Sequence, residues 1–170
     1  MRSAIEHQLT RDDPMIPRLA LAQASQKALS NAFFAICERE ADFSASEKKI
    51  AARLKGEVTN TMAERNNFAH GDWEMGFGIL GDPQLVRTKL TGVARAWVAT
   101  IRPANEIDAL SDELVRLTDW VLEFAWICFR VHPLTQYKHL KIRVSDIFQA
   151  KGKRVQRTGP LADETWFDED

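Results

Sequence analysis

The sequence predicts a mainly α-helical protein in which short β-strands separate the second and third of three long helices. Apolar residues recur at helical spacing over three long stretches, whereas glycines and a proline divide the residues from about 72 to 102 into short apolar runs. With 170 residues, 45% of them hydrophobic, the chain is long enough to bury one core. We therefore expect a single domain over residues 1–150 and a charged C-terminal tail over 151–170.

Local signals set the bounds of the first two helices. The first is predicted over about 14–39, where apolar residues recur at helical spacing. The second is predicted to begin near Ser46, because Ser44 and Glu47 have the spacing of a capping box. We expect it to end at His70, with the next glycine as its cap. Its apolar stripe is formed by Ile50, Leu54, Val58, Thr61 and Phe68.

The third long helix is predicted after Pro103, with Asn105 as its N-terminal cap and Pro133 as its end. Trp120, Trp126 and Phe129 lie outside its apolar stripe, so the helix has more apolar surface than one coiled-coil contact can cover. We therefore interpret the stripe as the core of a bundle and these aromatic residues as a candidate dimer contact. A short fourth element is expected over about 138–149. The stripe follows heptad spacing through Ile107, Leu110, Leu114, Leu117, Val121, Phe124 and Cys128.

Composition narrows the possible classes of function. The formal net charge is −1, so the molecule as a whole does not attract nucleic acid, and any RNA contact must be local. Cys37 and Cys128 lack the spacing of a zinc site or a redox pair, and we expect reduced, buried thiols. A charged N-terminus and the lack of a membrane-spanning apolar run predict a cytoplasmic protein. No metal site and no cofactor are predicted.

The segment Arg65-Asn66-Asn67-Phe68-Ala69-His70 carries the strongest functional signal. On the second helix, Arg65 falls inside the arc of the apolar stripe. A guanidinium on a packing face needs either a buried carboxylate or a site that uses a fixed cation. Asn66 and His70 are four residues apart and share a different face of the helix. These residues are therefore candidates for catalysis.

Cleavage of RNA without a metal needs a base for the 2′-hydroxyl, a positive group for the developing charge and a proton for the leaving oxygen. Histidine suits proton transfer near neutral pH, and the arginine fork matches two phosphate oxygens. In a regular helix, however, His70 points about 140° away from Arg65. The two can cooperate only if the helix unwinds at Gly71, or if a second copy supplies the complementary group across a dimer interface.

These residues resemble the Arg-x4–6-His motif of the HEPN (higher eukaryotes and prokaryotes nucleotide-binding) superfamily, in which a polar residue usually follows the arginine, as Asn66 does here. Ala69 and the following Gly71-Asp72-Trp73 are also similar to many members. The resemblance implies an antiparallel up-and-down helical bundle and a homodimer with the motif at its interface. It further implies metal-independent endoribonuclease activity in toxin–antitoxin or antiviral settings, with RNA and an antitoxin or another protein as partners.

In such a protein, Arg65 would bind and polarise the scissile phosphate, His70 would be the acid–base residue, and Asn66 would orient it. Asn67 is also predicted to contact the RNA. Trp73 can stack on a base, although an aromatic residue beside a helix end more often covers the core. The basic run that includes Lys151, Lys153 and Arg154 either follows an RNA backbone or forms a solvated face near an acidic tail.

Two alternatives to an enzyme remain open at this point. A non-catalytic HEPN-like module would bind a nucleotide, an RNA or a partner protein without cutting it. A helical scaffold would instead use the motif residues structurally, with Arg65 paired to a buried acid and His70 capping carbonyl groups at the helix end.

Overall fold

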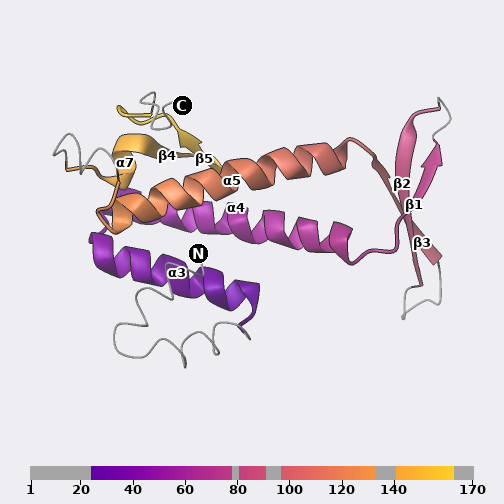
Figure 1. Ribbon diagram of the computed structural model, residues 1–170, viewed down its shortest axis with the longest axis horizontal. Coiled ribbons are helices and arrows are strands. Elements are labelled where there is room, and N and C mark those ends of the chain that lie inside the picture. Colours follow the sequence, from indigo (N-terminus) through magenta and orange to yellow (C-terminus); the bar gives the residue numbers. More distant parts are fainter. Residues whose placement is uncertain (1–23, 78–80, 91–96, 133–140, 163–170) are drawn as a thin grey trace. The chain divides into compact units, whose positions relative to one another are not determined.

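The computed structural model describes residues 24–77, 81–90, 97–132 and 141–162. Within these ranges the protein is mainly helical, with two small antiparallel sheets (Figure 1). The chain forms two compact units: unit 1 comprises residues 1–59 and 117–170, and unit 2 comprises residues 60–116. The elements in chain order are α3 (Gln26–Ala41), α4 (Ala45–Ala69), β1 (Glu74–Phe77), β2 (Pro83–Leu90), β3 (Trp97–Pro103), α5 (Glu106–Cys128), α7 (Val144–Ile147), β4 (Phe148–Lys151) and β5 (Arg154–Arg157).

Helix α3 begins later than the sequence predicts. Ser25 is extended, with φ −63° and ψ 152°, and its side chain accepts a hydrogen bond of 3.2 Å from the backbone N–H of Ala28. A serine in this conformation caps a new helix, so the prediction of one uninterrupted helix over 14–39 is wrong. Residues 14–23 lie outside the described residues, and α3 ends two residues after the predicted position.

Helix α4 begins with the capping box that the sequence predicts. The backbone N–H of Ser44 donates to Glu47 Oε2 at 2.9 Å, and the N–H of Glu47 donates to Ser44 Oγ at 3.4 Å. The helix starts at Ala45, one residue before the predicted start. The first four positions of its predicted apolar stripe are buried and Phe68 is half-buried. The stripe was therefore a correct guide to the packing face as far as Thr61.

Phe124 of α5 lies at the centre of the core of unit 1. It is fully buried, and its ring centroid lies 5.6 Å from those of both Phe34 and Phe43. Cys37 and Cys128 are buried free thiols in the same core, as expected. Leu117 and Val121 of the predicted α5 stripe are also buried, whereas Ile107, in unit 2, is 46% exposed. No helix in the described ranges is long and apolar enough to cross a membrane.

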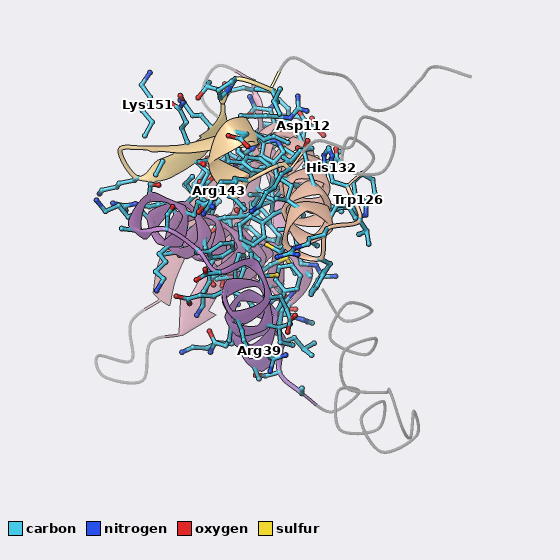
Figure 2. All side chains as sticks on the ribbon, turned by 90° about the vertical axis from the view of Figure 1, so that its left-hand side faces the viewer. Arg39, Asp112, Trp126, His132, Arg143 and Lys151 are labelled. Atoms are coloured by element: carbon cyan, nitrogen blue, oxygen red, sulfur yellow. The ribbon has the colours of Figure 1, made fainter. Side chains whose placement is uncertain are left out.

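Two aromatic residues outside the α5 stripe pack within the chain. Trp120 lies against Phe148, with ring centroids 5.8 Å apart, and Trp126 lies edge-on to His132 at 6.2 Å. Figure 2 shows Trp126 and His132 next to each other. These tryptophans, which are among the aromatic residues that the sequence suggests for a dimer contact, are half-buried and have aromatic partners in their own chain.

A hairpin occupies the start of the segment predicted as a tail. β4 pairs antiparallel with β5, and Gly152 adopts φ +59° at the first position of the two-residue turn between them. Val155 and Ala162 are 1% and 4% exposed. The tail prediction is therefore wrong for residues 151–162, because their apolar side chains complete the core. Residues 163–170 lie outside the described residues. Of the fourth element expected over 138–149, α7 and the start of β4 are present.

Three buried glutamates hold this C-terminal segment of unit 1. Arg143 Nε donates to Glu47 Oε1 at 3.1 Å, and the backbone N–H of Val155 donates to Glu57. Arg157 binds both carboxylate oxygens of Glu123 at 3.1 Å. Each of these glutamate residues is at most 9% exposed, and a buried carboxylate is stable only when hydrogen-bond donors replace its water.

Unit 2 contains the three-stranded sheet between α4 and α5 in the chain. Its strand order is β1-β2-β3, where the sequence predicts two or three short strands. Leu85 pairs with Met75 of β1 and with Arg102 of β3, so the three side chains share one face of the sheet. On this face Arg102 donates hydrogen bonds to Glu64 of α4 and to Glu106 of α5, the latter at 3.0 Å.

The ion pair of Glu47 should make the stability of unit 1 depend on acid pH. Burial raises the pKa of Glu47, but hydrogen bonds from Arg143 and Ser44 outweigh it and lower the pKa from 4.5 to about 2. A carboxyl with a lowered folded-state pKa stabilises the fold above its unfolded pKa and loses this effect as the pH falls through the folded value. We expect a contribution of about 3 kcal/mol that declines from pH 4.5 towards pH 2.

Urea denaturation of the wild type, Glu47→Gln and Glu38→Gln between pH 2 and pH 7 measures this effect. Glu38 is an exposed glutamate of the neighbouring helix, so its variant should keep the wild-type pH dependence. Glu47→Gln should be less stable at neutral pH and lose less stability on acidification. If the free energy of unfolding of Glu47→Gln fell with pH as steeply as that of the wild type, another group would govern stability in acid.

Candidate functional site at the end of helix α4

The motif residues lie at the C-terminal end of α4, in unit 2. The helix ends at Ala69, one residue before the predicted end, and the backbone N–H of His70 still donates to the carbonyl of Asn66 at 3.0 Å. His70 therefore continues the helical hydrogen-bond pattern, and unwinding does not turn it towards Arg65. At about 100° per residue, the two side chains leave the helix about 140° apart. Within one chain they do not face a common point.

Arg65 is exposed, and the prediction that it lies on the packing face is wrong. Among the described residues it forms no ion pair, and its Nη1 donates to Asn66 Oδ1 at 3.3 Å. The packing face of α4 changes in unit 2, where Glu64 and Phe68 meet Arg102 of the sheet. These two helix positions lie about 100° and 60° from Arg65.

The other polar side chains of the motif are also exposed. Asn66, Asn67 and His70 all lie on the surface. The side-chain oxygen of Asn66 is engaged by Arg65, so the structure brings these two residues together. Asn67 contributes its backbone carbonyl, rather than its amide side chain, to the local fold. The scaffold alternative, in which Arg65 pairs with a buried acid, is not what the described residues form.

Trp73 closes the end of the helix by stacking on Phe68. Their ring centroids are 5.2 Å apart at an angle of 22°, and Trp73 Nε1 donates to the carbonyl of Asn67 at 3.3 Å. A Cβ at Gly71 would lie 2.7 Å from that carbonyl oxygen and collide with the indole nitrogen of Trp73. Glycine at position 71 thus allows the indole of Trp73 to approach the carbonyl of Asn67. Trp73 covers Phe68, as an aromatic residue beside a helix end more often does than stack on a base.

Two arginines near this site were missed by the sequence analysis. The guanidinium of Arg87 lies 5.9 Å from the ring centroid of Trp73, and that of Arg102 lies 5.3 Å from the ring of Phe68. Arg102 is engaged by two glutamates, which leaves Arg87 as the additional candidate for a phosphate contact. The period-two alternation of β2 places Arg87 on the same face as Leu85, and that signal was available in the sequence.

The predicted basic residues Lys151, Lys153 and Arg154 lie at the turn of the β4-β5 hairpin. All three are exposed, and Figure 2 shows Lys151 extending outward from the hairpin. They belong to unit 1 and the motif residues to unit 2, so we treat the two groups as separate surfaces.

Comparison with protein-family models, curated proteins and solved structures gives no match to this chain. In the part of the chain that the structure describes, no three histidine, cysteine, aspartate or glutamate side chains are grouped so that they could hold a metal ion. A function for the end of α4 is therefore inferred only from its own residues and their geometry.

Gly71→Ala should destabilise the protein by about 1–3 kcal/mol, because the added methyl group pushes Trp73 away from Phe68 and Asn67. Gly56→Ala, inside α4, is the matched control, since a Cβ at Gly56 meets nothing within 4 Å. Alanine there should stabilise the helix by about 0.5–1 kcal/mol. Urea denaturation of both variants measures the difference, and two alanine variants of equal stability would contradict the close packing at Gly71.

Proposed function

We propose that this chain is a metal-independent endoribonuclease of the HEPN type, which cleaves single-stranded or loop RNA by attack of the 2′-hydroxyl on the adjacent phosphate. The observation that carries the proposal is the separation of roles among residues 65–73. Phe68, Gly71 and Trp73 provide the packing contacts at the helix end. Arg65 and His70 present exposed polar groups beside them. Such groups are available to a ligand because the fold does not use them.

The chemistry of these groups suits a phosphodiester. The guanidinium of Arg65 can bind two phosphate oxygens and stabilise the charge that develops on them. The imidazole of His70 can transfer protons near neutral pH. Asn66 lies against Arg65 and would fix the direction of the guanidinium, which is a different role from orienting His70. Arg87, beside Trp73, would contact a neighbouring phosphate.

The geometry favours a site shared between two copies of the chain. Arg65 and His70 diverge by about 140° on a continuous helix, so one copy does not direct both groups at one phosphate. In a twofold homodimer with the α4 ends at the interface, Arg65 of one copy would lie beside the partner's histidine. We also propose that the helices form an antiparallel up-and-down bundle and that the protein is cytoplasmic. Its biological role would be that of a toxin with a cognate antitoxin, or of an antiviral effector.

The exposed cations of the hairpin supply a second surface for RNA. Lys151, Lys153 and Arg154 are grouped at one tight turn of unit 1. Contacts of this kind bind phosphates without regard to sequence and weaken as salt rises. They would increase affinity for RNA, while the residues at the end of α4 would cut it.

The direct test is cleavage of fluorophore-labelled RNA, with chelator present, by His70→Ala and Arg65→Ala. Both variants should lose at least about 100-fold in rate, because proton transfer and phosphate binding are each removed. Their melting temperatures should stay at the wild-type value, since both side chains are exposed. Arg53→Ala removes an exposed arginine from the same helix and should cleave normally.

Three outcomes would contradict the proposal in different ways. Full cleavage by His70→Ala would remove the histidine from the mechanism. A wild-type chain that binds varied RNAs and cuts none would identify the non-catalytic module. Unfolding of Arg65→Ala would instead give the arginine a structural role.

Mixing the two inactive variants tests the shared site. If each site takes Arg65 from one copy and His70 from the other, a mixed dimer keeps one intact site. Equilibrated mixtures of Arg65→Ala and His70→Ala should then recover about a quarter of the wild-type activity, because about half of the dimers are mixed and one of their two sites is intact. Recovery is absent if both groups come from the same chain, and that result would overturn the arrangement.

A further inference from the structure

Unit 1 contains a hollow that the ribonuclease proposal does not use. Its volume is about 420 Å³, within the range of about 300–1,000 Å³ typical of small-molecule sites. The end of α5, the start of α4 and the residues just before α7 form its walls. Its lining combines apolar side chains such as Phe43 and Ile127 with the charged residues Glu47, Arg130, Lys141 and Arg143.

The charges on this lining are unbalanced. Glu47 accepts hydrogen bonds from Arg143, so these two residues neutralise each other; Figure 2 shows Arg143 between α4 and α7. Asp42 and Asp146 also act on Arg143 electrostatically but do not line the hollow. Arg130 and Lys141 are exposed and form no ion pair with any described residue. The hollow therefore offers two cations beside an apolar wall.

Arg130 has a backbone conformation that favours glycine. The backbone N–H of Arg130 donates to the carbonyl of Ile127 at 3.1 Å, and the N–H of Val131 donates to the carbonyl of Trp126 at 2.9 Å. This is the Schellman pattern of a helix end, and Arg130 occupies its left-handed position with φ +57°. A side chain is strained there relative to glycine. What arginine adds at this position is a guanidinium at the hollow.

We propose that the hollow binds a small organic oxyanion, in which a carboxylate or a phosphate ester is attached to an apolar group. Arg130 and Lys141 would hold the oxyanion, because charge-assisted hydrogen bonds to a carboxylate or phosphate are the strong ones and the arginine fork matches two of its oxygens. The apolar group would lie against Phe43 and Ile127. This site is independent of the motif at the end of α4.

Isothermal titration of the purified chain with phenyl phosphate and with benzoate tests the proposal. At least one of the two should bind saturably and raise the melting temperature, since a ligand that binds only the folded state stabilises it. Inorganic phosphate should bind more weakly than phenyl phosphate because it lacks the apolar group. Benzyl alcohol should bind more weakly than benzoate because it lacks the negative charge. Binding of phenyl phosphate alone assigns the site to phosphate esters, and binding of benzoate alone assigns it to carboxylates.

Variants separate ligand binding from folding. Arg130→Gly should raise the melting temperature, because glycine suits the left-handed position, and yet weaken binding by about tenfold or more. Lys141→Gln should weaken binding to a similar degree without changing the melting temperature. Arg53→Ala, which removes an exposed arginine away from the hollow, should change neither property.

The proposal is overturned if neither anion binds the wild type, or if benzyl alcohol binds as tightly as benzoate. It is also overturned if Arg130→Gly binds the anion with wild-type affinity.

Discussion

The burial of three carboxylates in unit 1 is the constraint on which its remaining structure depends. Glu47, Glu57 and Glu123 are removed from water, and the donors described for them include two guanidinium groups and one backbone N–H from residues 143–157. Removal of a carboxylate from water without a donor costs several kcal/mol. The positions of α7, β4 and β5 follow from this requirement. The hollow follows as well, because Arg143 forms part of its wall while it neutralises Glu47.

Two arginines in unit 2 illustrate how a fold can leave a cation available for chemistry. Arg102 reaches the packing face of α4 from the sheet, where it is engaged by Glu64 and Glu106 and lies over Phe68. The positive charge on the packing face of α4 in unit 2 is therefore supplied by Arg102 of β3. Arg65, one residue after Glu64, is left exposed with Asn66 as its neighbour. The same division separates Trp73, which packs, from His70, which does not.

Local signals in the sequence predicted the parts of the fold that depend on neighbouring residues. The Ser44–Glu47 capping box and the apolar stripe of α4 both depend on spacings of three or four residues, and both are present. The β4-β5 hairpin could not be found in this way. Its strands are four residues long within a basic run, and its anchor Glu57 is 98 residues from Val155.

The candidate site was predictable only in part for a similar reason. The motif spacing identified Arg65, Asn66 and His70, but the exposure of Arg65 depends on which neighbour α4 meets. That neighbour is Arg102, 38 residues from Glu64 in the sequence. The left-handed backbone of Arg130 has no sequence signal at all, since arginine is not the residue that the position favours.

The discontinuous construction of unit 1 has a consequence for the newly made chain. Glu47 is synthesised 96 residues before Arg143, and at ordinary rates of translation this interval lasts about 5–20 s. Unit 2 is complete before the C-terminal half of unit 1 leaves the ribosome. Until α5 has been made, Phe34 of α3 lacks Phe124, the α5 residue whose ring centroid lies 5.6 Å from its own. The ion pairs and hydrogen bonds of unit 1 are therefore completed only after the last donor, Arg157, has emerged.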